Sequence, residues 1–175
     1  MGLRITPSSN ELYNCNELSS AGLLSYHCTS PSGKYGHADQ TEISRRIDFY
    51  GADGALEAYS VSALFVAEQN VFDASDTLIG TIRNTNNMVT KMFQGDAYDF
   101  FDHTKKKIAS ARSDFWLHHY TFYNPHTEQI IATSEVPWFF SNTYTIKILR
   151  PDTIDPSMIV FMHIKNSIIR ADDDR

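Results

Sequence analysis

Five consecutive apolar residues near the carboxyl end most constrain how this chain can fold. Asp155-Pro156 precedes them and predicts a helix start, with aspartate as the N-cap and proline in the first helical position. Five successive residues on a helix point in every direction, so a helix over 156–169 begins without a polar face. Polar side chains gather toward its end, at Lys165 and Asn166. We therefore expect apolar neighbours on all sides of the core-helix residues Met158, Ile159, Val160, Phe161 and Met162.

The middle of the chain repeats a three-part pattern. A segment that ends in an aromatic residue is followed by a polar turn and then by a segment of smaller apolar residues. The aromatic ends are Tyr50, Phe72, Phe101 and Tyr123. Turn-forming residues after each of them predict β-hairpins. Together with alternating apolar residues at 143–149, these segments predict about ten to twelve strands. Open twisted sheets of that size usually curl or close, which also removes their exposed edges.

The helix and the strand count favour one fold class: a mainly β protein in which a closed antiparallel β-barrel of about 12 strands encloses a hydrophobic C-terminal helix. A barrel of about eight strands is filled by its own side chains, whereas a larger one can hold a central helix. Residues 1–42 are rich in Ser, Asn, Thr and Gly, and we expect a partly ordered N-terminal arm that supplies one strand. Residues 43–175 are expected to form the barrel, with the helix at 156–169.

Charge and composition exclude several classes of function. The chain has 175 residues, of which 15 are basic and 21 acidic, for a net charge of −6. This balance argues against wholesale nucleic-acid binding. No apolar run approaches the roughly 20 residues of a membrane-spanning helix, and the first residues lack the apolar region of a signal peptide. Two cysteines fit a reducing compartment better than a disulfide scaffold. We expect a soluble, cytoplasmic protein that can associate peripherally with a membrane.

Three hairpins and the helix carry a resemblance to a known family. The hairpins are Phe49 to Leu56, Phe72 to Gly80 and Phe122 to Ile130, and the helix begins with Asp155 to Met162. In order and kind they resemble the tubby C-terminal-like superfamily, which includes tubby domains, phospholipid scramblases and LURP-one-related proteins. The resemblance covers roughly residues 45–169. It implies a twelve-stranded barrel around a hydrophobic helix, and association with membranes or lipid headgroups. The basic phosphoinositide clamp of tubby domains and the acidic calcium segment of scramblases have no residue-by-residue match here.

A basic run supplies the candidate lipid- or anion-binding residues: Lys105, Lys106, Lys107 and, a few residues later, Arg112. Lysines beside an anionic surface contribute about 1 kcal/mol each. The same run also suits a solvated hairpin turn whose charges deter edge pairing. The sequence favours the second interpretation, because an acidic chain gives a basic patch little long-range support.

No pattern predicts a catalytic or metal site. The spacing of Cys15 and Cys28 is not that of a zinc site, and a nucleophilic cysteine also needs a base and an orienting group. We expect small, buried or idle cysteines, no metal and no cofactor. An enzyme that uses Cys28 with His27 or His37 remains an alternative.

The expected function is a non-catalytic binding or adaptor module that recognises a phosphoinositide, another lipid headgroup or a protein partner. A second alternative is a lipocalin-like carrier of a small apolar ligand, in which the helix would lie outside and show a polar face. Trp138, Phe139 and Phe140 could dock against a partner, but an interior position is favoured because nothing polar separates the three rings.

Overall fold

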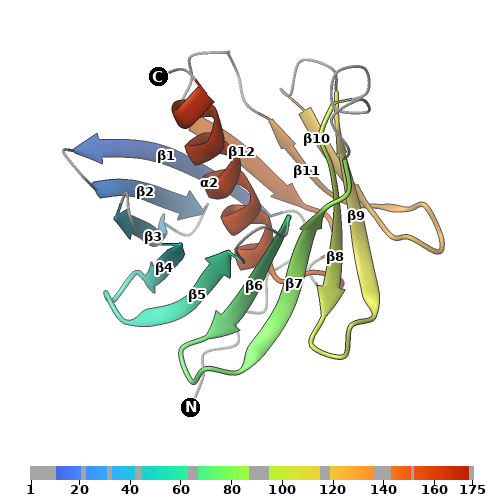
Figure 1. Cartoon of the computed structure of the whole chain (residues 1–175), viewed down its shortest axis with the longest axis horizontal. Coiled ribbons are helices and arrows are strands. Elements are labelled where there is room, and N and C mark those ends of the chain that lie inside the picture. Colours follow the sequence, from blue (N-terminus) through green and yellow to red (C-terminus); the bar gives the residue numbers. More distant parts are fainter. Residues whose placement is uncertain are drawn as a thin grey trace.

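A computed structural model describes residues 11–20, 23–30, 33–41, 45–62, 67–86, 95–114, 119–135, 143–150 and 152–173. Within these residues the chain forms strands followed by a C-terminal helix (Figure 1). The strands are β1 (Glu11–Ser20), β2 (Leu23–Ser30), β3 (Gly33–Thr41), β4 (Arg46–Gly51), β5 (Leu56–Ser62), β6 (Glu68–Asp73), β7 (Leu78–Asn84), β8 (Ala97–Asp102), β9 (Lys107–Ser113), β10 (His119–Tyr123), β11 (Ile130–Glu135) and β12 (Thr143–Ile148), and the helix is α2 (Pro156–Asp173).

The strands pair antiparallel with their neighbours in sequence, and the first strand also pairs with the last. Cys15 on β1 lies opposite Tyr144 on β12 and opposite Cys28 on β2. The hydrogen-bonded strand order is that of a closed barrel, with β1 between β12 and β2. The expected fold class is confirmed as mainly β, with an antiparallel sheet and a C-terminal helix.

The predicted hairpins form, and their turns are built by the same device. In the β6–β7 turn, Asp73 Oδ1 accepts hydrogen bonds from the backbone N–H groups of Ser75 and Thr77, each at 2.9 Å. Asp102 plays the same part in the β8–β9 turn, and Asn124 in the β10–β11 turn. Hydrogen bonds to the ionised carboxylates lower the pKa values of Asp73 and Asp102. These polar residues therefore shape turns.

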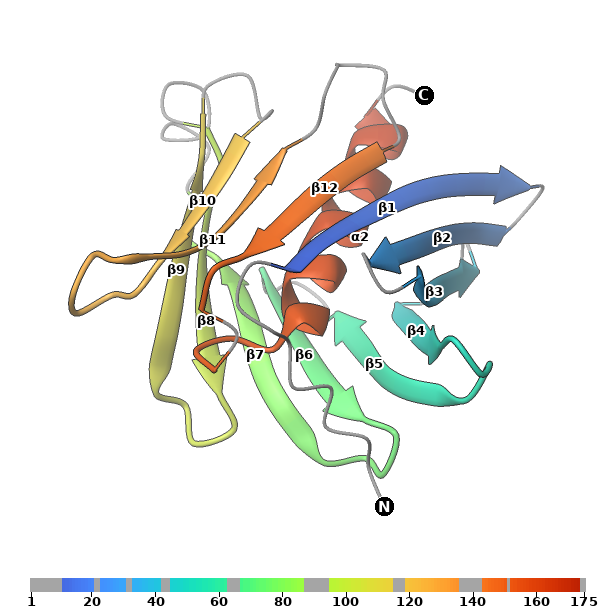
Figure 2. The ribbon, with the colours of Figure 1, turned by 180° about the vertical axis from the view of Figure 1, so that it is seen from behind.

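Helix α2 runs through the space that the strands surround, and two opposite views agree on this (Figures 1 and 2). Its five leading apolar residues, Met158 to Met162, are each at most 1% exposed. The Phe161 ring meets Phe49 of β4 edge-on, with ring centroids 6.4 Å apart. On β7, a Cβ atom added to Gly80 would lie 2.8 Å from Met158 Cε, so glycine allows the helix to approach this strand. The expected apolar surroundings are present.

The helix start is also as expected, whereas its end is not. Asp155 Oδ1 accepts hydrogen bonds from the backbone N–H of Ser157 at 2.9 Å and from its hydroxyl at 2.6 Å, which is the N-cap arrangement. The helix continues to Asp173, four residues beyond the expected end.

The expectation for residues 1–42 was wrong in extent. This region supplies three strands, β1, β2 and β3, instead of one. The composition is polar because a strand needs apolar side chains on one face only. Among the residues with described side chains, Tyr26, Cys28 and Ala38 are buried, while His27 between them is exposed. Residues 11–20, 23–30 and 33–41 of the expected arm are therefore part of the sheet.

Candidate functional site

The second half of α2 carries polar side chains that are buried and hydrogen-bonded to several strands. His163 Nε2 lies 2.7 Å from the Ser134 hydroxyl of β11. The Tyr98 hydroxyl of β8 donates to Asn166 Oδ1 at 2.5 Å, and Asn166 Nδ2 donates to the Tyr120 hydroxyl of β10 at 3.3 Å. Buried polar groups are normally paired in this way, because an unmade hydrogen bond in the interior is costly.

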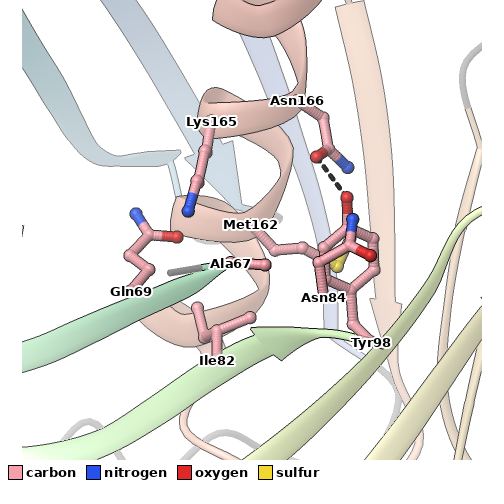
Figure 3. A pocket seen from close by; sticks show the side chains of 8 residues that line it. All are labelled: Ala67, Gln69, Ile82, Asn84, Tyr98, Met162, Lys165 and Asn166. Carbon is pink, nitrogen blue, oxygen red and sulfur yellow. Dashed lines mark hydrogen bonds between the residues drawn. The ribbon is translucent and has the colours of Figure 1, made fainter. Parts of the chain in front are cut away.

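Next to this network lies a pocket of about 100 Å³, here called the mouth pocket. Figure 3 shows the side chains that line it, which come from α2, from β6, β7 and β8 and from Ala67 just before β6. They are Ala67, Gln69, Ile82, Asn84, Tyr98, Met162, Lys165 and Asn166. Most of the wall is apolar, and a few polar groups reach into it. This composition is typical of small-molecule sites.

Lys165 is the charged group of the mouth pocket. Its Nζ donates a long hydrogen bond of 3.5 Å to the Glu68 carbonyl oxygen. Among the described residues, no carboxylate lies within ion-pair distance of it. Burial lowers the pKa of Lys165, because removal of water disfavours the ammonium form. The half-buried amine therefore has no matching anion in the part of the chain that the structure describes.

Gln69 contributes a buried acceptor to the same pocket. Its Nε2 donates to the Ser60 hydroxyl at 2.8 Å and, at 3.5 Å, to the Phe161 carbonyl oxygen. Within the described ranges, its Oε1 has no hydrogen-bond partner, although the residue is only 1% exposed. The Ser60 hydroxyl can donate or accept, whereas the Phe161 carbonyl oxygen can only accept and therefore favours the amide orientation in which Nε2 faces it.

The candidate basic residues divide into two pairs. Lys105 and Lys106 are exposed at the tip of the β8–β9 turn, where Lys105 adopts a left-handed backbone with φ of 65°. Lys107 and Arg112 instead line one shallow depression of about 210 Å³ on the β8–β9 face, here called the basic hollow. The four residues are thus not one patch.

An acidic side chain that the sequence reasoning missed organises the basic hollow. Asp99 Oδ1 lies 2.7 Å from Lys107 Nζ and accepts a hydrogen bond from the Ser110 hydroxyl at 2.8 Å. The Arg112 guanidinium lies over the Tyr123 ring, 5.6 Å from its centroid. Asp99 neutralises Lys107, so among the described residues the unmatched charge of the hollow is centred on Arg112. Cross-strand pairing of Asp99 with Ser110 could have indicated this, had the register been known.

The sequence predicted buried or idle cysteines, and Cys28 is buried at 1% exposure, but it is disulfide-bonded. Cys15 is the other cysteine of the chain and the register partner of Cys28. A disulfide-bonded sulfur is not a free nucleophile, and exposed His27 points to the opposite face of β2. The structure thus gives no support to an enzyme that uses Cys28. Disulfides are typical of oxidising compartments, which weighs against the reducing one expected.

His27 and His37 stack on the outer face of β2 and β3, with ring centroids 5.6 Å apart. Within the described part of the chain, no three His, Cys, Asp or Glu side chains are grouped as metal ligands.

Among the described residues, no helix has the length and apolar character needed to cross a membrane. Trp138, Phe139 and Phe140 lie outside the described residues.

Comparison with known proteins adds information on the fold. No family model matches the chain, and no curated protein matches it. Among solved structures, the X-ray structure of a protein from Arabidopsis thaliana, AT5G01750, is similar to it with a TM-score of 0.60. The match covers 94% of this chain and 92% of that chain, with 12% identical residues. At this identity the likeness shows a shared fold over nearly the whole length of both chains.

Proposed function

We propose that this protein is a non-catalytic binding module whose basic hollow recognises a phosphate-bearing lipid headgroup, such as that of a phosphoinositide, at a membrane surface. The observation that carries the proposal is the convergence of Lys107 and Arg112 on one hollow. Guanidinium and ammonium donors together suit a phosphate, which accepts several charge-assisted hydrogen bonds. The Ser110 hydroxyl lines the same hollow and donates its proton to Asp99.

Asp99 has a positioning part in this proposal. Its contact with Lys107 holds the ammonium beside the hollow before a ligand arrives, which reduces the ordering cost of binding. It also removes one positive charge from the unliganded site. The site therefore favours a group with more than one negative charge, which can draw Lys107 away from a single carboxylate.

The rest of the fold serves as a rigid support in this proposal. The buried start of α2 fills the space between the strands, and the headgroup is bound on the outside, at the basic hollow. The lipocalin-like alternative does not fit, because it needs a helix with an outward polar face, whereas Met158 to Met162 are buried. Kinship with the tubby C-terminal-like superfamily belongs to the same proposal, as does peripheral attachment to a membrane.

Vesicle co-sedimentation tests the proposal. Phosphatidylcholine vesicles with a few per cent of phosphoinositide should bind the protein, less so as salt rises, and plain phosphatidylcholine vesicles should not. The double variant Lys107→Glu/Arg112→Glu should weaken binding about tenfold or more. Lys105→Glu/Lys106→Glu changes charge equally at the turn tip and should have a smaller effect.

Two outcomes would contradict the proposal. The parent protein could bind none of the vesicles, which would leave a protein partner as the remaining expectation. Alternatively, both double variants could weaken binding equally, and the basic hollow would then have no special part. A soluble inositol phosphate that competes with the vesicles would show that the headgroup, not the membrane surface, is recognised.

A further inference from the structure

We propose that the mouth pocket is a second binding site, for a small monocarboxylate with a short apolar chain and a hydroxyl beside its carboxylate. Lys165 would hold the carboxylate, and Gln69 would accept the hydroxyl proton. This site lies on the inner side of the sheet, and although Tyr98 lines both pockets, neither Lys165 nor Gln69 lines the basic hollow. It therefore does not depend on headgroup recognition.

The first argument concerns charge. A cation withdrawn from water is stabilised in proteins by an opposite charge and by hydrogen bonds. Among the described residues, Lys165 has only the long contact to the Glu68 carbonyl oxygen and no carboxylate partner. The Glu68 carboxylate itself pairs with Arg83 on the outer face. An anionic ligand would supply the charge that this chain does not place beside Lys165.

The second argument concerns Gln69 Oε1, a buried acceptor that receives no hydrogen bond from the described residues. Buried side-chain oxygens nearly always accept a hydrogen bond, and an exception calls for an absent partner. Gln69 Oε1 is such an exception within the described residues. Figure 3 shows Gln69 and Lys165 reaching from β6 and α2 toward the same space. A carboxylate alone would satisfy Lys165 and face Gln69 Oε1 with another acceptor, whereas a neighbouring hydroxyl can donate to it.

The third argument concerns size and walls. Ile82, Met162 and the Tyr98 ring supply apolar surface next to the polar groups. The volume of about 100 Å³ is below the roughly 150 Å³ of a cavity that holds benzene. A chain of about three to five carbons therefore fits, and a long fatty acid does not.

Calorimetric titration with four matched compounds tests the inference: butanoate, 2-hydroxybutanoate, butan-1-ol and butylamine. We expect 2-hydroxybutanoate to bind most tightly, butanoate several-fold more weakly, and the alcohol and the amine not measurably. Lys165→Met keeps the length of the side chain and removes its charge, and it should lower affinity for both acids at least tenfold. Lys147→Met removes an exposed lysine of β12 and should bind like the parent.

Each contrary result would contradict a particular part of the proposed monocarboxylate site. If neither acid binds, or if butan-1-ol binds as well as butanoate, the Lys165 site is wrong. Equal losses in Lys165→Met and Lys147→Met would mean non-specific attraction and would also overturn it. Equal affinity for the two acids would remove the part given to Gln69. Thermal melting shows whether each variant is folded, and unchanged phosphoinositide-vesicle binding by Lys165→Met separates this site from the basic hollow.

Discussion

The two halves of α2 meet the surrounding strands in different ways. From Met158 to Met162 every side chain is apolar and buried, and contacts such as Phe161 on Phe49 depend on shape alone. From His163 to Asn166 the buried side chains include polar ones that form directed hydrogen bonds to β8, β10 and β11. The first half stabilises the fold through burial, and the second half specifies how the helix is seated.

Directionality explains why both halves are needed. Burial of a helix start that is apolar all round constrains the rotation of the helix less sharply than hydrogen bonds do, because the hydrophobic effect itself is non-directional. The hydrogen bond between His163 and Ser134 and the one that Tyr98 donates to Asn166 can form together in one rotation only. Seating the helix in this rotation also presents Lys165 to the mouth pocket.

The largest expected effect comes from a charge in the first half. Phe161→Asp should abolish folding, because it removes a packed ring, worth about 3–5 kcal/mol, and leaves a carboxylate unpaired in the interior. Together these costs approach the whole stability of a domain, about 5–15 kcal/mol. Circular dichroism and solubility measure the result. Phe161→Leu is the control and should stay folded. A soluble Phe161→Asp protein with a melting temperature like that of the parent would contradict the burial of the first half of α2.

An intermediate effect is expected from the hydrogen bonds of the second half. Tyr98→Phe keeps the ring but removes the donor to Asn166 Oδ1, which costs about 1–3 kcal/mol in the free energy of unfolding. Tyr50→Phe on the outer face of β4 is the matched control, and we expect a change within about 0.5 kcal/mol. Urea titration measures both. Equal small effects would show that directed bonds do not distinguish the two halves.

The smallest effect concerns pH and Lys165. Its pKa is lowered in the folded state, so above this value the unfolded chain binds more protons than the folded one. The cost of holding the ammonium is therefore present at neutral pH and disappears as pH rises toward the ordinary lysine value. Relative to Lys165→Met, the parent should gain unfolding free energy between neutral and alkaline pH. Urea titrations of both proteins at several pH values test this, and a constant or falling difference would contradict it.

Local chemistry explains which parts of the fold could be predicted. Asp155 at the helix start and Asp73 at a hairpin turn bond to backbone groups within a few residues, so sequence spacing is sufficient to predict them. The burial of Met158 to Met162 follows from the absence of a polar face. Of the three strands before residue 42, one was expected and two were missed, because polar residues on the outer face, such as His27 and His37, hide the alternation.

The candidate sites depended on contacts between distant residues, and these were harder to predict. Gln69 and Lys165 are far apart in the sequence, and only the packing of α2 against β6 brings them to one pocket. Asp99 required the β8–β9 register. Cys28 has Cys15 as its register partner across β1 and β2, whereas the spacing of the two residues along the chain carries no sign of it.

The pairing of β1 with β12 has a consequence for how the protein is made. Strand β1 leaves the ribosome long before its partner β12, and helix α2, which fills the space between the strands, follows β12. Until β12 and α2 are made, the growing polypeptide exposes unpaired strand edges and the apolar inner face of the sheet, and both favour aggregation. Closure between such distant segments is also slow. A truncated product ending before residue 156 should therefore need a chaperone to remain in solution.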